Sequence, residues 1–204
     1  MILNPAFHKN LLIQILKDIY SDTSIAPFLG LKGGTAAYLF YDLDRFSVDL
    51  DFDLLDETKE EIVFSHIEDI AKNYGNIKEV RKKRFNLFFL ISYEEKAQNI
   101  KIEVNRRTFG SKYEVKTYLG ISMQIMEKQD MFAHKLMAMY ERLGKTNRDI
   151  YDVWFFLKHQ WNINKLIVEN RSGDSYKKFV QKCINALEKM TNKQILYIQN
   201  NRCF

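Results

Sequence analysis

Polar and apolar residues alternate one by one in SVDLDFDLL, residues 47–55. Successive side chains of a β-strand point to opposite faces, so this alternation predicts a strand with one face in the core. Leu50 and Phe52 then face the core. The opposite face carries three carboxylates, those of Asp49, Asp51 and Asp53. Further strands are expected at 84–94, 99–107, 113–120 and 121–126.

Helical spacing of apolar residues marks the other parts of the chain. It predicts a helix at 6–20, a short buried helix at 35–41 and a third at 57–75, where Thr58 and Glu61 have the spacing of a capping box. After residue 126, helices are expected at 127–144, 147–160 and 174–190. The predicted fold class is α+β, a mixed sheet flanked by helices and followed by a helical C-terminal half. The expected domains are 1–126 and 127–204.

Composition narrows the class of protein. The 204 residues are 46% hydrophobic and 28% charged, which is typical of a folded globular chain. No run of about 18 apolar residues and no secretory signal are visible, so we expect a cytoplasmic protein without a membrane span. Two cysteines, Cys183 and Cys203, are too few for a disulfide framework and are expected to be a core thiol and a tail thiol.

The positive charge is concentrated near the C-terminus. Residues 171–204 hold seven Lys and Arg against two Asp and Glu, whereas the remainder holds 24 of each sign. Such a region suits a polyanionic partner such as RNA, or is a solvated basic face. The run RKKR at 81–84 also has two interpretations. It contacts RNA phosphates, or it protects the following apolar strand from aggregation.

Carboxylates on one strand face repel each other unless cations neutralise them. Asp49 and Asp51 are hard oxygen ligands of the kind that Mg²⁺ prefers, since it binds through one or two carboxylates plus substrate phosphates. Glu103, on the strand predicted at 99–107, is a third candidate ligand. It could equally pair with Lys101 or an arginine, and the Asp pair could simply face solvent.

Two glycines precede the carboxylates. Gly33 and Gly34, followed by Thr35 and a predicted helix start, offer backbone N–H groups without side-chain obstruction. A helix N-terminus favours phosphate, although a lone Gly-Gly pair is more often an ordinary turn. A phosphate cradle and metal-binding carboxylates within one short segment are stronger evidence for a functional site together than either is alone.

The segment LKGGTAAYLFYDLDRFSVDLDFD closely resembles the first motif of the AbiEii/AbiGii-type toxins, a branch of the polymerase-beta-like nucleotidyltransferase superfamily. The matching residues are Lys32, Gly33, Gly34, Thr35, Ala36, Arg45, Ser47, Asp49, Leu50, Asp51 and Phe52. AHKLMAMYERLGKTNRDIYDVWFFL is similar to the downstream motifs through Lys135, Arg148, Asp149 and Asp152.

This resemblance implies a nucleotidyltransferase-like fold and a Mg²⁺- or Mn²⁺-dependent transfer of NMP from an NTP. The implied acceptor is RNA, notably the 3′ end of tRNA. The resemblance also implies the toxin half of a toxin–antitoxin or phage-defence (abortive infection) system, with an antitoxin encoded nearby. Two alternatives stay open: nucleotidylation of a protein target, and a non-catalytic RNA-binding module of the same fold.

The resemblance also implies roles for single residues. Asp49 and Asp51 are expected to bind the metal, with Asp49 also activating the acceptor. Lys135 is expected to neutralise β- and γ-phosphate charge, and Asp149 to orient Lys135 or act as a second acid. Asp152 is an alternative to Asp149. The remaining nucleotide contacts are expected from Lys32, Gly33, Gly34, Thr35 and Ser47.

Overall fold

The computed structural model describes residues 4–94 and 98–190, so that Cys203 lies outside the described residues. The chain forms two compact units. One comprises the residues up to 108 together with 113–126, and the other comprises 109–112 together with the residues from 127 onward. The two domains expected from the sequence, 1–126 and 127–204, stay a prediction.

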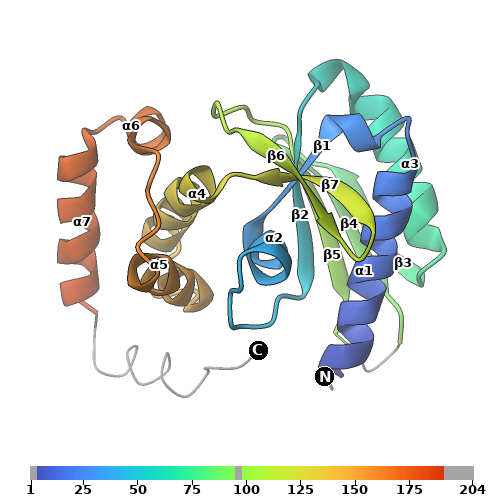
Figure 1. Ribbon diagram of the computed structural model, residues 1–204, viewed down its shortest axis with the longest axis horizontal. Coiled ribbons are helices and arrows are strands. Elements are labelled where there is room, and N and C mark those ends of the chain that lie inside the picture. Colours follow the sequence, from blue (N-terminus) through green and yellow to red (C-terminus); the bar gives the residue numbers. More distant parts are fainter. Residues whose placement is uncertain (1–3, 95–97, 191–204) are drawn as a thin grey trace. The chain divides into compact units, whose positions relative to one another are not determined.

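The first unit is built on a seven-stranded sheet with the strand order β3-β4-β5-β2-β1-β7-β6 (Figure 1). The β2–β5 and β1–β7 pairs are parallel, and the other neighbours are antiparallel. The mixed α+β class predicted from the sequence is therefore confirmed. The strands are β1 (Leu29–Lys32), β2 (Asp49–Leu54), β3 (Asn76–Lys82), β4 (Asn86–Ser92), β5 (Ile100–Asn105), β6 (Tyr113–Tyr118) and β7 (Ile121–Met126).

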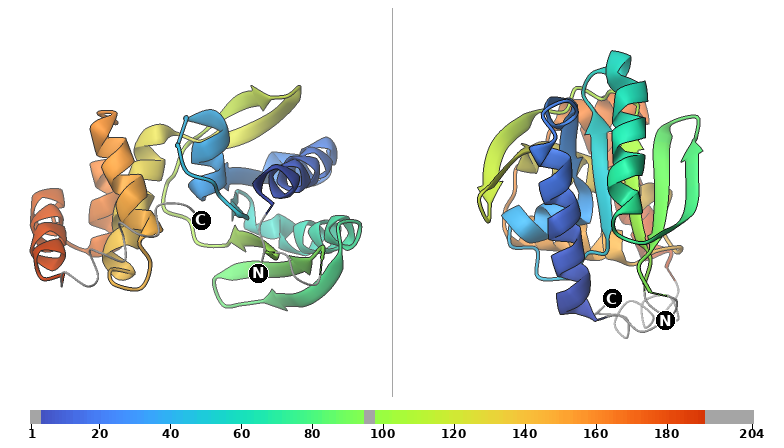
Figure 2. Two further views of the ribbon diagram at one scale, coloured as in Figure 1. Left: turned by 90° about the horizontal axis from the view of Figure 1, so that it is seen from below. Right: turned by 90° about the vertical axis from the view of Figure 1, so that its right-hand side faces the viewer.

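Two helices, α1 (Pro5–Ser21) and α3 (Glu60–Lys72), lie side by side against one face of the sheet (Figure 2). The apolar residues of the alternating strands lie beneath them. Phe52 is fully buried with its ring 6.3 Å from that of Tyr20, and Phe89 lies 5.1 Å from Phe64. Burying side chains of this size stabilises the fold by about 1.5–3 kcal/mol each. The apolar positions predicted at Leu50 and Phe52 are confirmed, since both are fully buried.

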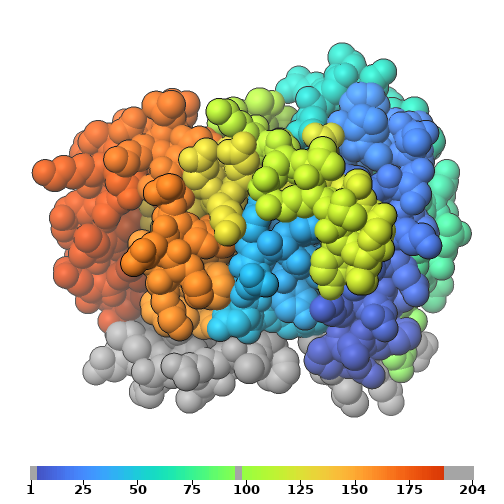
Figure 3. All heavy atoms as spheres, in the orientation of Figure 1, coloured from blue at the N-terminus to red at the C-terminus, as the bar shows by residue number. Residues whose placement is uncertain are grey.

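The opposite face of the sheet carries the carboxylates. Helix α2 (Gly33–Phe40) begins on this face, directly after β1, with Gly33 against the Asp51 side chain. Strand β6 lies at one edge of the sheet and pairs with β7. Figure 3 shows the β6–β7 hairpin on the surface of this unit.

Several local predictions differ from the structure. The segment at 57–75 begins as a 3₁₀ turn, Glu57–Lys59, and the carboxylate of Asp56 caps this turn by accepting from the backbone N–H of Thr58. The predicted capping box is therefore wrong. The two glycines are not an ordinary turn, because α2 already begins at Gly33. Strands β1 and β3 were not expected, because β1 has four residues and β3 is a largely exposed edge strand without clear alternation.

The second unit contains helices α4 (Lys128–Glu141), α5 (Arg148–Lys158), α6 (Lys165–Ser172) and α7 (Tyr176–Glu188). The Phe156 ring stacks on Trp161 at 4.1 Å and meets Phe132 edge-on at 5.6 Å. Helix α6 was not predicted, since its buried residues, Ile167 and Val168, are too few for a clear apolar pattern. None of the described helices is long and apolar enough to cross a membrane.

Cys183 lies buried in α7, as the sequence predicted for a core thiol. Burial raises the pKa of this thiol to about 11. The thiolate is the reactive form of cysteine, so Cys183 is a packing residue rather than a nucleophile at neutral pH.

A buried histidine connects α1 to the start of the carboxylate strand. His8 is fully buried, and its ring donates from Nε2 to the carbonyl of Val48 and accepts at Nδ1 from the hydroxyl of Tyr93, both at 3.0 Å. Val48 directly precedes Asp49. Burial lowers the pKa of His8, and this outweighs the hydrogen bond to Val48 and the attraction of Asp49, which raise it.

We predict that this histidine makes the fold less stable in mild acid. Its folded pKa lies below the unfolded value of about 6.5, so the unfolded chain takes up the proton first as pH falls. Stability is therefore fully present above about pH 6.5 and decreases below it, until the folded pKa is passed. Urea unfolding at pH 7.5 and pH 5.5 should show a smaller loss for His8→Gln than for wild type. An equal loss would contradict the prediction, and the exposed His159→Gln serves as the control.

Candidate active site

The parallel pairing of β2 with β5 places acidic side chains next to each other. In this register Asp51 lies beside Glu103, and Asp49 lies beside Lys101. Because side chains of directly paired residues share a face, Asp49, Asp51 and Glu103 project from the same side of the sheet. The sequence left open whether the two strands were neighbours, and the structure shows that they are.

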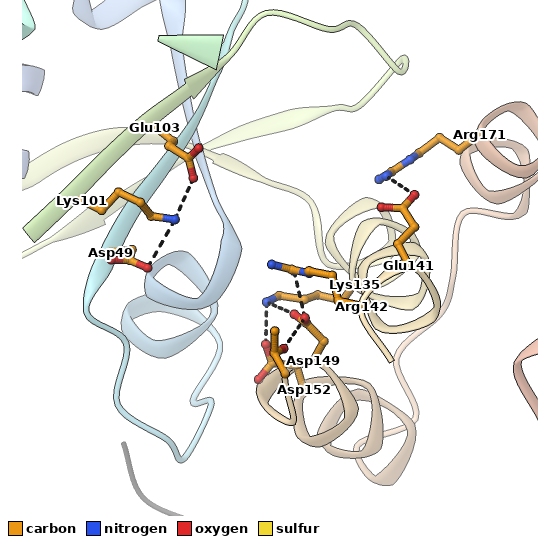
Figure 4. A network of polar contacts seen from close by, with 10 residues as sticks. Asp49, Lys101, Glu103, Lys135, Glu141, Arg142, Asp149, Asp152 and Arg171 are labelled. Carbon is orange, nitrogen blue, oxygen red and sulfur yellow. Dashed lines mark hydrogen bonds and ion pairs between the residues drawn. The ribbon is translucent and has the colours of Figure 1, made fainter. Parts of the chain in front are cut away.

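Lys101 lies between two of these carboxylates (Figure 4). Its ammonium is 2.7 Å from Glu103 Oε2 and 3.5 Å from Asp49 Oδ2. Burial lowers the pKa of Lys101, but Asp51, Asp49 and Glu103 together raise it above its usual range. Lys101 therefore stays charged and offsets part of the negative charge. From the sequence, Lys101 was predicted only as a possible partner of Glu103. The signal was its position two residues before Glu103, which places both side chains on the same strand face.

Glu103 also accepts a hydrogen bond from the side-chain amide of Asn86. Its carboxylate is thus engaged on both sides, by Asn86 and by Lys101. In residues 4–94 and 98–190, no three His, Cys, Asp or Glu side chains form a group suited to a metal ion. The role of Glu103 as a third metal ligand stays a prediction.

Asp53, the last carboxylate of the row, is buried within its own set of partners. Lys32 Nζ lies 2.5 Å from Asp53 Oδ1, the Asn105 amide donates to the same oxygen at 2.6 Å, and the Tyr113 hydroxyl donates to Oδ2. The Tyr113 ring covers Gly30, where a Cβ would lie 2.2 Å from a ring carbon. These contacts fix β1, β2 and β6 to one another. The predicted nucleotide contact of Lys32 is not tested by them and stays a prediction.

Helix α2 directs its N-terminus toward the carboxylates. Gly33 has φ +76°, and a Cβ there would lie 2.6 Å from Asp51 Oδ2. A Cβ at Gly34 would lie 2.8 Å from Ser47 Oγ and 3.0 Å from Arg45 Nη2. The N-cap residue, Lys32, makes no side-chain hydrogen bond to this N-terminus. A helix N-terminus offers backbone N–H groups to a ligand such as phosphate. Glycine is favoured at Gly33 by the positive φ and the closeness of Asp51, while at Gly34 a Cβ would displace the side-chain ends of Ser47 and Arg45.

Three polar residues surround this helix start. The Thr35 hydroxyl, which is almost fully buried, donates to the backbone carbonyl of Asp49 and ties the first turn of α2 to β2. Ser47 is buried beside Gly34. Arg45 is part of the sequence motif, but the sequence analysis predicted no function for it. It stands two residues before Ser47, which indicated that both side chains lie on the same side of the chain. The nucleotide contacts of Thr35 and Ser47 stay predictions.

The second unit contains a separate cluster of charged side chains (Figure 4). Lys135 Nζ lies 2.7 Å from Asp152 Oδ2 and 3.2 Å from Asp149 Oδ1. Asp149 also pairs with Arg142 Nη2 at 2.9 Å and accepts from the Thr146 hydroxyl at 3.0 Å. The structure thus brings both acids to Lys135, and both are almost fully buried. Their roles toward a nucleotide stay predictions.

Solved structures define the class of this protein. JHP933 from Helicobacter pylori is 26% identical with a TM-score of 0.55, over 76% of this chain and 66% of that one. Another H. pylori structure, described as a candidate nucleotidyltransferase, has the same sequence identity to this chain and the same TM-score. The match covers 76% of this chain and 68% of that one. The chain thus spans about two thirds of these relatives. The antibiotic-resistance factor ANT(2'')-Ia shares the fold, with 12% identity and a TM-score of 0.56 over 90% of this chain and 96% of that one.

These similarities place the protein among the nucleotidyltransferases. The family model described as "Nucleotidyl transferase AbiEii toxin, Type IV TA system" matches residues 14–195, so the chain belongs to the AbiEii family. The family indicated by the sequence motifs is therefore confirmed. A search among curated proteins gave no match.

We predict that a methyl group at the start of α2 is poorly tolerated. An alanine at positive φ costs about 1–2 kcal/mol, and the overlap of its Cβ with Asp51 adds about 1–3 kcal/mol for Gly33→Ala. Gly110 has φ +72° with nothing within 4 Å of a Cβ, so Gly110→Ala isolates the strain alone. Urea unfolding should show the larger loss for Gly33→Ala. Equal losses would show that contact with Asp51 carries no cost.

We predict that Lys135 is required for stability of the second unit. Lys135→Met leaves Asp149 and Asp152 buried without this cation and should lower the free energy of unfolding by about 3–5 kcal/mol. The side chain of Arg142 is 50% exposed, so Arg142→Ala should cost less than about 1 kcal/mol. Chemical denaturation of both variants tests this difference, and a comparable cost for the two would contradict it.

Proposed function

We propose that this protein transfers a nucleoside monophosphate from an NTP to a hydroxyl group of RNA, with Asp49 and Asp51 holding Mg²⁺ or Mn²⁺. The observation that carries the proposal is the contact of Gly33, at the uncapped start of α2, with the carboxylate of Asp51. A helix N-terminus offers N–H donors to phosphate, and the carboxylates offer ligands to a cation that accompanies phosphate.

The donor set fits a hard divalent cation. Asp49 and Asp51 supply carboxylate oxygens on one sheet face, and their side chains are not covered by helices α1 and α3, which lie on the other face. Two carboxylates plus substrate phosphates form a usual set of Mg²⁺ ligands. When bound, the cation would shield the phosphate charge and stabilise the attacking and leaving oxygens. Glu103 is kept as a candidate third ligand.

The reaction itself is a displacement at the α-phosphorus. An acceptor hydroxyl oxygen forms a bond to the α-phosphorus. The bond between the α-phosphorus and the oxygen that bridges it to the β-phosphate breaks, and pyrophosphate leaves. We propose that Asp49, the first residue of β2, accepts the hydroxyl proton as a general base. The N–H groups of Gly33 and Gly34, with Ser47, would hold triphosphate oxygens, and Lys32 and Thr35 are kept as further candidates.

Lys135 is the candidate cation of the second unit. Its ammonium is held by Asp149 and Asp152, so its position is fixed by two acids rather than by solvent. We propose that Lys135 stabilises the leaving pyrophosphate and that Asp149 orients Lys135, with Asp152 as the alternative.

The biological role in this proposal is supported by the family. The family description names a toxin of a type IV toxin–antitoxin system, which supports a counteracting antitoxin as partner. We propose the 3′ end of tRNA as the acceptor and inactivation of tRNA as the toxic effect. The cytoplasmic location expected from the sequence is part of this proposal.

We predict that the two aspartates are essential for transfer. Asp49→Asn and Asp51→Asn should each lower incorporation of α-labelled NTP into total tRNA by at least about 100-fold, since each removes a charge needed in the transition state. Asp69→Asn, which removes a carboxylate from a side chain that is 70% exposed on α3, should retain full activity. Gel separation of RNA and protein, with each NTP tested separately, gives the readout.

The destination of the label decides between the alternatives. Label in RNA that disappears in both active-site variants supports the proposal and identifies the nucleotide. Label in protein alone would replace the RNA acceptor by a protein target. Full incorporation by Asp49→Asn would contradict the assignment of the site.

A further inference from the structure

The face that carries the carboxylates continues across β4 and β3. Phe88 of β4 is paired directly with Glu103 of β5, and Arg81 of β3 is paired directly with Phe88. Paired residues share a face, so an aromatic ring and a guanidinium follow Glu103 in the same row. Helices α1 and α3 pack on the other face, where Phe89 contacts Phe64.

Basic side chains accompany this row. Lys83 Nζ lies 3.3 Å from the ring centroid of Phe88. The side chains of Lys83 and Arg81 are 40% and 70% exposed, so both reach solvent. The Lys83 ammonium therefore lies over the ring of Phe88 while its side chain still reaches solvent.

The turn between β3 and β4 presents a second aromatic ring. Phe85 is 45% exposed, and the guanidinium carbons of Arg84 and Arg107 each lie 4.9 Å from its ring centroid. The turn is held in place by Arg106, whose backbone N–H donates to the Phe85 carbonyl at 2.8 Å and whose side chain donates to the Lys83 carbonyl at 3.0 Å. The ring and its two guanidinium groups are therefore presented on a fixed scaffold.

We call the solvent-facing side chains of this region the hairpin surface, and it combines two aromatic rings with a positive charge. Its residues are Arg81, Lys83, Arg84, Phe85, Phe88 and Arg107. Glu79 pairs with Arg81 and Lys83, but the four basic groups outnumber this one carboxylate. Protection of a hydrophobic strand from aggregation would explain the charges. It would not explain an exposed phenylalanine whose ring centroid lies 4.9 Å from each of two guanidinium carbons.

We propose that the hairpin surface binds an unpaired RNA strand, with a base stacked on Phe85 and phosphates held by Lys83 and Arg84. Bases of single strands stack on aromatic rings and arginine planes, whereas bases within a duplex are not accessible for this. An acidic protein would use the charges but would leave the ring exposed. The proposal rests on the proposed function in one respect, since the bound strand would be the acceptor.

Binding can be measured without catalysis, which separates this proposal from the proposed transfer reaction. The probe is a fluorescein-labelled, unstructured 12-nucleotide RNA, and the protein carries Asp49→Asn in a buffer with EDTA and no NTP. Fluorescence anisotropy is recorded at several salt concentrations, for this RNA and for a duplex of the same length.

We predict that Phe85→Ala weakens binding of the single strand by about 5-fold or more, the cost of losing one stacked base. Phe85→Trp, which keeps an aromatic ring, should retain wild-type affinity. The pair Lys83→Ala and Arg84→Ala should reduce the slope of log affinity against log salt by about 1.4, since two phosphate contacts are lost. Circular dichroism melting verifies that each variant is folded.

A matched control removes two charges from the basic C-terminal region. Lys177→Ala with Lys189→Ala, both exposed on or at the end of α7, should leave affinity and salt slope unchanged. The proposal is overturned if Phe85→Ala binds like wild type, if the α7 pair causes the larger loss, or if only the duplex is bound. An acidic peptide that binds while the RNA does not would equally overturn it. None of these outcomes depends on whether the protein transfers nucleotides.

Discussion

Repulsion between carboxylates on one sheet face is the constraint on which the first unit depends. The pairing of β2 with β5 places Asp49, Asp51 and Glu103 side by side, which costs stability unless positive charge is supplied. Lys101 supplies one cation within the sheet, and the N-terminus of α2 adds a favourable dipole near Asp51. The remaining negative charge is what we propose a divalent cation and its bound triphosphate neutralise.

The other carboxylate of the row shows the contrast. Asp53 belongs to the same strand face, yet Lys32, Asn105 and Tyr113 satisfy both its oxygens. One strand thus carries an acid whose partners lie within the protein and two acids that we propose act on a ligand. In the second unit Lys135 provides the reverse arrangement, a cation held between two buried acids, Asp149 and Asp152.

The sequence predicted the features that depend on local pattern. Strict alternation in β2 identified both its buried face and its carboxylate row, and helical periodicity located α1, α4, α5 and α7. It did not predict which strands pair, because the parallel neighbour of β2 begins 46 residues after the end of β2 and local patterns carry no such information. The role of Lys101 depends on that pairing. Short elements such as β1 and α6 bury too few residues to leave a periodic signal.

Metal binding by Asp49 and Asp51 is the central claim, and its most direct test needs no turnover. Mn²⁺ is titrated in the presence of a non-hydrolysable NTP analogue, and the free ion is followed by electron paramagnetic resonance. We expect wild type to bind Mn²⁺, and the double variant Asp49→Asn with Asp51→Asn to lose this binding while remaining folded. Equal Mn²⁺ binding by the two proteins would contradict the account, because the carboxylates would then not hold the metal.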